Sequence, residues 1–73
     1  MPKILPLSAR KIIKILTGNG FVVETQRGSH IKLKKRDGGT VHTVIVPNYP
    51  EIGPMVINSI IRQSGLPKEL FCG

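Results

Sequence analysis

The chain reads Arg27-Gly28-Ser29-His30-Ile31-Lys32-Leu33-Lys34 across residues 27–34. From His30 onward polar and apolar side chains alternate, which is the pattern of a β-strand with one buried and one exposed face. His30, Lys32 and Lys34 then share one face of the strand, and the two apolar residues between them share the other. We predict that the apolar face packs on a core and that the basic face meets solvent.

Two further strands are predicted on either side of this segment. The β-branched and extended polar residues from Phe21 to Arg27 indicate a first strand, which ends at Gly28. The second strand starts at Ser29 or His30 and runs to Lys35. Beyond it, Arg36-Asp37-Gly38-Gly39 predicts an Asp-Gly hairpin turn that leads into a third strand from Thr40 to Val46, ended by Pro47.

Amphipathic helices are predicted at both ends of the chain. Ser8 is a favoured N-cap for the first helix, whose apolar residues recur at helical spacing to about residue 19. Gly20-Phe21 is typical of a left-handed helix end with its apolar contact. The second helix begins at Pro54 and ends in the same way at Gly65-Leu66. Residues 67–71 are predicted to add one further helical turn.

The order helix, three strands, helix determines the expected fold class. Two apolar helix faces can be buried together only against one side of an antiparallel sheet, which leaves the other side open to water. Placing Lys32 and Lys34 under the helices would bury two unpaired ammonium groups, at several kcal/mol each. We therefore predict an α+β fold with the order α-β-β-β-α, a three-stranded antiparallel sheet and both helices on one face, in a single domain over residues 1–73.

The charge of the chain restricts its partners. Eleven Lys and Arg against four Asp and Glu give a formal net charge of +7. Five of these cations lie between Arg27 and Arg36, and such clustering favours a phosphate-bearing or acidic partner. Cys72 is the only cysteine, which excludes a disulfide framework and a cysteine-ligated zinc site. Two histidines and few carboxylates give no basis for another metal site, so we expect no cofactor.

The expected compartment follows from the N-terminal segment and the cysteine content. Residues 1–7 contain two prolines and no uninterrupted apolar run, so we expect neither a signal peptide nor a membrane span. A single unpaired cysteine suits a reducing environment. The prediction is a cytoplasmic protein without membrane association.

These features together resemble a known protein family. The matching motifs are Arg27-Gly28-Ser29-His30 at the start of the second strand, Val44-Ile45-Val46-Pro47 at the end of the third, and Ile60-Ile61-Arg62-Gln63-Ser64-Gly65-Leu66 at the end of the second helix. With the length, element order and basic charge, they make nearly the whole chain similar to the HicA family of toxins. The chain departs from the family pattern at Asn48-Tyr49, where members often carry a histidine or another basic residue, and at Met55, where glycine is usual.

The resemblance implies a type II toxin with a fold like that of double-stranded-RNA-binding domains. It implies cleavage of messenger RNA to arrest translation, with His30 as the catalytic residue, and neutralisation by a HicB antitoxin that covers the active surface. No second catalytic histidine is carried over, because of the departure at residues 48–49. We expect a monomer when the protein is alone and a hetero-oligomer with the antitoxin.

A single imidazole can support RNA cleavage. Near neutral pH it can accept the proton of a ribose 2′-hydroxyl, so that this oxygen attacks the adjacent phosphorus in line and expels the 5′-oxygen. General base assistance contributes typically ~10²–10⁴-fold, so we expect a slow nuclease. The cations would hold the phosphate, and the glycine would let the backbone amides approach it. The predicted RNA-binding residues are Arg27, Gly28, Ser29, Lys32 and Lys34.

Other interpretations of these residues stay open. On the strand pattern alone, His30 is equally consistent with a surface histidine that does no chemistry. Ser29 beside a base suggests a nucleophile, but without an orienting carboxylate nearby a role in the turn is favoured. His42 would supply an acid if the strand register brought it to His30, although we treat it as an ordinary strand residue. Tyr49 could stack on a base or anchor the loop.

Two other functions fit the same charge. One is a non-catalytic RNA-binding module with the same basic surface. The other is a protein-interaction domain whose cations meet an acidic partner. A nuclease cleaves RNA, whereas a non-catalytic RNA-binding module does not. A toxin arrests growth until one cognate protein relieves the arrest, whereas a protein-interaction domain shows neither effect.

Overall fold

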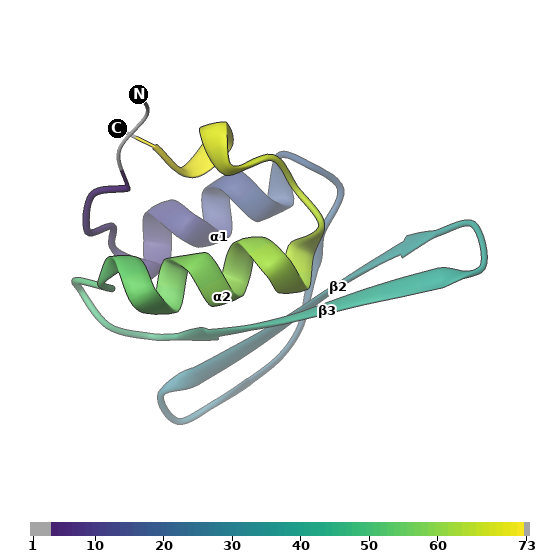
Figure 1. Ribbon diagram of the computed structural model, residues 1–73. Coiled ribbons are helices and arrows are strands. Elements are labelled where there is room, and N and C mark those ends of the chain that lie inside the picture. The colour runs from purple at the N-terminus through teal and green to yellow at the C-terminus, as the bar shows by residue number, and fades with distance from the viewer. Residues whose placement is uncertain (1–3, 73) are drawn as a thin grey trace.

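The computed structural model describes residues 4–72, which form an α+β fold. The elements are α1 (Ala9–Thr17), β1 (Val22–Arg27), β2 (His30–Asp37), β3 (Thr40–Pro47), α2 (Pro54–Ser64) and the 3₁₀ turn η1 (Lys68–Phe71). The strands form one antiparallel sheet in the order β1-β2-β3, and both helices cover the same side of it (Figure 1). The predicted fold class is confirmed.

The expectation of no signal peptide concerned residues 1–7, and the first three of these lie outside the described residues. Between residues 4 and 72, no helix is long and apolar enough to cross a membrane.

The core lies between the helices and one face of the sheet. Ile31 and Leu33 are 5% and 0% exposed, whereas His30, in the alternate position, is exposed. This confirms the predicted two-sided strand. Each buried aliphatic side chain contributes roughly 1.5–3 kcal/mol, so the alternation is strongly specified. The other core residues are Ala9, Ile12, Leu16, Phe21, Val44, Val46, Ile52, Ile57, Ile60 and Phe71.

Helix α1 begins at the residue that the sequence indicated, and its ending has the predicted form but comes two residues earlier. The Lys11 amide donates to Ser8 Oγ at 3.1 Å, which makes Ser8 the N-cap. The last helical residue is Thr17, two positions before the predicted end, because residues 18–20 form a turn. Gly20 has φ +95° and the Phe21 amide donates to the Leu16 carbonyl at 3.1 Å, which is the left-handed ending that was predicted.

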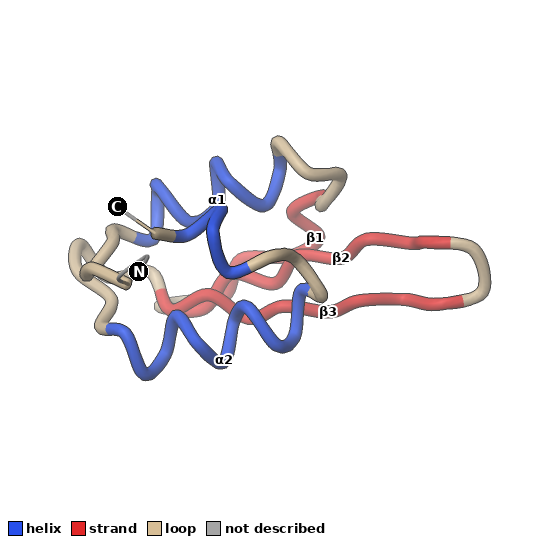
Figure 2. Tube along the Cα trace, turned by 45° about the horizontal axis from the view of Figure 1, so that its top comes forward, coloured by secondary structure: helices blue, strands red, loops and turns tan. Residues whose placement is uncertain are grey.

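The second hairpin turn differs from the prediction. Asp37 pairs with Thr40 as the last residue of β2, and Gly38-Gly39 are the two turn residues. Gly38 has φ +61°, a conformation that two-residue hairpins need and that glycine adopts at little cost. The predicted Asp-Gly turn is therefore wrong by one residue, since shifting it allows one more strand pair to form. The resulting β2–β3 hairpin projects beyond the helices (Figure 2).

The first strand contains a bulge that the sequence did not reveal. Val23 pairs with Leu33 and Thr25 pairs with Lys32, so the register shifts at Glu24. The extra residue moves Thr25 to the face of the sheet away from the helices. Strand β1 itself begins at Val22 because the preceding Phe21 is bonded to the end of α1.

The segment between β3 and α2 is hydrogen-bonded to the start of α1 and to the β1–β2 turn. Leu7 and Ile52 exchange two backbone hydrogen bonds, of 3.1 and 2.6 Å. The Ala9 amide donates to the Tyr49 carbonyl at 3.0 Å, and the Asn48 amide donates to the Ser29 carbonyl at 2.6 Å. The start of α1 and the β1–β2 turn are thereby held at the same end of the molecule.

Replacement of Gly65 by alanine tests the packing of α2 on the sheet. Gly65 has φ +70°, and a Cβ there would lie 3.1 Å from Cε1 of His42. We expect Gly65→Ala to lower the free energy of unfolding by about 1–2 kcal/mol, from left-handed backbone strain and the close contact together. Urea unfolding monitored by circular dichroism measures this loss.

The matched control is Gly39→Ala, because Gly39 has ordinary φ and an added Cβ there meets nothing within 4 Å. In a His42→Ala background, the loss from Gly65→Ala should shrink to the backbone contribution. An equal loss at Gly39 and Gly65 would contradict the packing described above.

Candidate functional site

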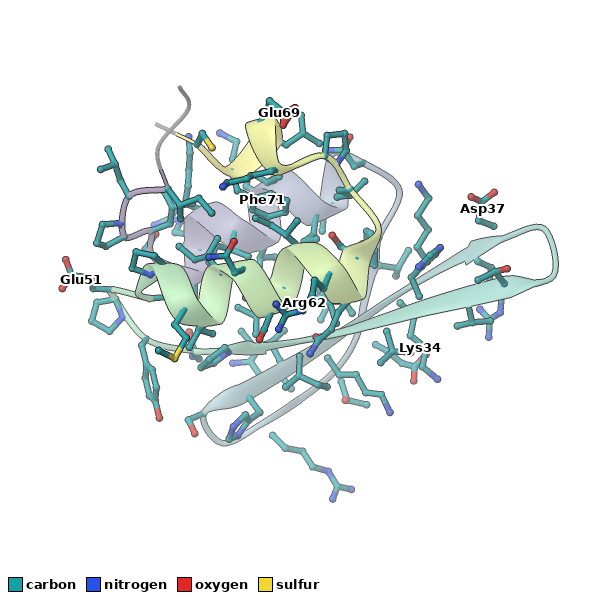
Figure 3. The ribbon with its side chains drawn as sticks, in the orientation of Figure 1. Lys34, Asp37, Glu51, Arg62, Glu69 and Phe71 are labelled. Atoms are coloured by element: carbon teal, nitrogen blue, oxygen red, sulfur yellow. The ribbon has the colours of Figure 1, made fainter. Side chains whose placement is uncertain are left out.

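The face of the sheet away from the helices is basic. Strand β2 presents His30, Lys32, Lys34 and Arg36 on this face, because the residues between the first three are buried under the helices. The Lys34 side chain extends from the sheet on the side away from α1 and α2 (Figure 3). We call this surface the open face. The predicted orientation of the basic strand is confirmed.

His30 lies at one end of the open face, where all three strands meet. It is the first residue of β2 and pairs with Arg27 of β1 on one side and Pro47 of β3 on the other. Directly opposite residues in antiparallel strands have Cβ atoms about 4.5–5.5 Å apart, so Arg27 and His30 are neighbours. A shallow depression of about 390 Å³ is lined by Thr25, Arg27, His30, Lys32 and Ile45.

The β1–β2 turn sets the position of His30. Gly28 has φ +55° at the first position of the two-residue turn, and nothing lies within 4 Å of a Cβ placed there. Glycine suits that position in a tight hairpin, and it leaves the turn backbone accessible. The Ser29 carbonyl accepts the Asn48 amide at 2.6 Å, so the turn is braced against the segment after β3.

The Ser29 side chain makes only a long contact with the histidine. Ser29 Oγ lies 3.5 Å from His30 Nδ1, at the limit of hydrogen bonding. That geometry supports a role in orienting the ring better than activation of Ser29 as a nucleophile. Because the contact is on Nδ1, Nε2 is the ring nitrogen turned away from Ser29.

Lys34 lies apart from the other predicted cations. Its Nζ is 3.3 Å from Glu24 Oε1, and both side chains are partly exposed. Lys34 and Glu24 line a second depression together with Lys35, Arg36, Gly20, Val22 and Val23. The structure therefore brings Arg27, His30 and Lys32 together and leaves Lys34 in an ion pair farther along β2.

His42 lies far from His30, on the opposite face of the sheet. It pairs with Lys35, five register positions from the His30–Pro47 pair, which is roughly 17 Å along the strand. Its ring packs against Gly65 at the end of α2, on the helix side. The interpretation in which His42 acts as the acid for His30 is wrong, because the register places the two rings on opposite faces.

Thr25 and Ile45 line the depression although the sequence did not single them out. Thr25 reaches it because of the bulge at Glu24, and Ile45 because it pairs with Lys32. Knowledge of the strand register would have identified both residues, but the register depends on the exact positions of the turns. Tyr49, which was considered for base stacking, is 52% exposed and holds α1 through its carbonyl rather than its ring.

The depression combines one base with two cations. The imidazole can accept a proton, and Arg27 on the neighbouring strand and Lys32 two residues along β2 can bind an anionic group placed against it. No carboxylate is present among the five lining residues. Within residues 4–72, no three His, Cys, Asp or Glu side chains are grouped so that they could hold a metal ion.

Comparison with known protein families gives a match over most of the chain. A family model described as the HicA toxin of bacterial toxin–antitoxin systems matches residues 9–66, from the start of α1 to just beyond the end of α2. No individual curated protein matches the chain at a significant level. The family match includes every residue that lines the depression.

Gln63 of α2 braces the strand that carries Ile45. Its Oε1 accepts the Ile45 amide at 3.3 Å, at the outer edge of β3. We expect Gln63→Ala to accelerate hydrogen exchange of the Ile45 amide by about 5- to 10-fold, since an exposed hydrogen bond contributes roughly 1 kcal/mol. Exchange measured by NMR checks this.

Gln26→Ala is the control, because Gln26 is an exposed residue of β1 for which the structure shows no side-chain hydrogen bond within the described chain. Unchanged exchange at Ile45 in the Gln63 variant would mean that the helix does not support the strand edge.

Proposed function

The chain belongs to the HicA toxin family of bacterial toxin–antitoxin systems, and we propose that it is an endoribonuclease that cleaves messenger RNA at the depression around His30. The observation that supports this best is the exposed imidazole that shares a depression of the open face with Arg27 and Lys32. RNA carries both the nucleophile and the electrophile for this chemistry, a 2′-hydroxyl beside a phosphodiester. The site needs to provide only a base, cations and alignment.

His30 accepts the 2′-hydroxyl proton through Nε2 in this proposal. The freed oxygen attacks the neighbouring phosphorus and the 5′-oxygen leaves, which gives a 2′,3′-cyclic phosphate and a new 5′-hydroxyl end. Arg27 and Lys32 bind the non-bridging phosphate oxygens and offset their growing charge. Ser29 orients the ring through Nδ1. With no carboxylate in the depression and no second histidine nearby, water protonates the leaving oxygen, and turnover is slow.

The remaining residues of the depression fit a nucleotide. Ile45 offers an apolar surface for a ribose or base, and the Thr25 hydroxyl offers a hydrogen bond to a sugar or phosphate oxygen. The open turn at Gly28 and Ser29 allows the RNA backbone to approach closely. Lys34 contributes less to binding than Lys32, because Glu24 already offsets its charge.

Substitution of His30 tests the proposal. We expect His30→Ala to reduce the cleavage rate by about 10²–10⁴-fold, since it removes the general base. RNA affinity and the unfolding midpoint should change little, because the ring is exposed and outside the core. Single-turnover cleavage of a labelled RNA, filter binding and thermal unfolding measure the three quantities.

His42→Ala is the matched control, since it removes the other histidine from the opposite face of the sheet. DNA of the same sequence should stay intact, because it lacks the 2′-hydroxyl. Undiminished cleavage by His30→Ala contradicts the mechanism, and binding without any cleavage by the unaltered protein would identify a non-catalytic RNA-binding module.

We further propose that a HicB antitoxin neutralises the toxin in the cytoplasm by covering Arg27, His30 and Lys32. A chain of net charge +7 favours capture by an acidic surface or an inserted acidic loop. The free toxin is a monomer, and the complex is hetero-oligomeric. The exposed open face leaves these cations accessible to such a partner.

Salt dependence tests the electrostatic contact with the antitoxin. We expect the association rate constant to fall by at least about 10-fold between 50 mM and 500 mM salt, as charges on the two partners are screened. Stopped-flow or surface-based kinetics with the cognate antitoxin measure it. Association that does not respond to ionic strength would indicate an apolar contact instead, and failure of co-expression to relieve growth arrest would contradict neutralisation.

A further inference from the structure

Helix α1 carries a second group of cations, away from the depression. Arg10, Lys11 and Lys14 are all exposed, on the part of the helix that does not pack on the core. We call these three residues the basic face of α1. Arg10 and Lys14 are one helical turn apart, as are Lys11 and Lys14, so the three side chains lie on adjoining positions of the helix surface.

This arrangement opposes the stability of the helix. The first turn of α1 contains no acidic residue, and Arg10 and Lys11 stand near the positive end of the helix dipole, where cations are unfavourable. Lys11 occupies the third helical position after the Ser8 cap, where Glu or Gln would complete a capping box. Arg10 and Lys14 repel each other at a spacing of four. Folding alone would favour other residues at positions 10 and 11, whereas Lys14 lies in the last turn, where the helix dipole favours a cation.

Among residues 4–72, none of these three cations forms a salt bridge. The ion pair found among residues 4–72 joins Lys34 to Glu24, on the other side of the sheet. The acidic side chains of Glu51 and Glu69 lie at the outside of the molecule in Figure 3. The Ala9 and Lys11 amides at the start of α1 are already bound, by the Tyr49 carbonyl and by Ser8 Oγ. The three side chains are therefore the main groups that can hold an anion here.

The basic face begins at the end of the molecule that holds His30. The Ala9 amide bonds to Tyr49, and the neighbouring residue Asn48 bonds to Ser29, which precedes His30. Figure 1 shows the first turn of α1 and the β1–β2 turn at the same end, in the helix layer and the sheet layer respectively. A polyanion that leaves the depression at this end and continues to the helix layer would come to the start of α1, which carries Arg10 and Lys11.

We propose that the basic face of α1 binds phosphates of the same RNA strand whose scissile bond lies at His30. The inference rests on the proposed RNA substrate and adds a second contact region to it. Bound phosphates relieve the repulsion between the cations of the unliganded helix. The repulsion that destabilises the free protein therefore contributes favourably to the free energy of RNA binding. RNA long enough to reach both regions, about 16 nucleotides, binds more tightly than RNA of about 4 nucleotides.

The test uses Lys11→Glu, because its predicted effects on binding and stability have opposite signs. The new carboxylate suits the start of the helix and completes the capping box, so the unfolding midpoint should rise by roughly 2–4 °C. Affinity for the longer RNA should fall about 10-fold, and the slope of log affinity against log salt should become shallower by about 0.7 for the lost phosphate contact. Binding is measured in a His30→Ala background, so that no cleavage intervenes.

The matched control is Arg62→Glu, which makes the same charge change in the last turn of α2, where a cation is favourable. It should lower the unfolding midpoint and weaken RNA binding by less than 3-fold. Equal loss of affinity in the two variants would show an effect of net charge alone and would overturn the proposal. Unchanged RNA affinity in Lys11→Glu, with or without a loss of antitoxin affinity, would overturn it as well.

The outcome is separable from that of the nuclease proposal. If the unaltered protein binds RNA through Lys11 without cleaving it, the role of the basic face of α1 in RNA binding is supported. The catalytic role of His30 is then contradicted. If it cleaves RNA and Lys11→Glu binds as tightly as before, the catalytic proposal stands and the basic face of α1 is not part of the RNA site.

Discussion

Burial of Ile31 and Leu33 beneath the two helices is the constraint from which the rest of the molecule follows. Each side chain contributes roughly 1.5–3 kcal/mol, and a shift of one residue would move both of them into water. The intervening His30, Lys32 and Lys34 are therefore held on the opposite face without needing any contact of their own. The open face is the side of the sheet that does not pack on the core, so its side chains are accessible to a ligand.

The two ends of this surface are set by local backbone features. Gly28 allows a two-residue turn that makes Arg27 and His30 direct neighbours, and the bulge at Glu24 adds Thr25 to the same face. The bond between Ser29 and Asn48 then fixes the turn against the segment that follows β3. Backbone hydrogen bonds and turn geometry thus set the position of His30 in this 73-residue chain, and the Ser29 side chain adds one long contact to the ring.

The distribution of charge separates three kinds of cation. Lys34 is paired with Glu24, which makes it the least available for a ligand. Arg27 and Lys32 line the same depression as the exposed imidazole, where a phosphate would meet all three groups. Arg10 and Lys11 lie at the start of a helix, where the helix dipole disfavours cations. Residues that are unfavourable for folding indicate a role other than stability. Cations that contribute equally to the net charge therefore differ in their surroundings, and these differences follow from their positions in the fold.

Much of this protein was determined by its sequence, because local patterns act over a few residues. Local patterns predicted the elements and the orientation of the sheet: the alternation after His30, the Ser8 cap and the endings at Gly20 and Gly65. The Gly-Ser-His motif indicated the family. Strand register was decided only by the tertiary structure. It placed the second turn at Gly38-Gly39, introduced the bulge at Glu24, moved His42 to the helix side and brought Thr25 and Ile45 beside His30. Strand register depends on the packing and hydrogen bonding of whole strands together. A short stretch of residues therefore does not determine it.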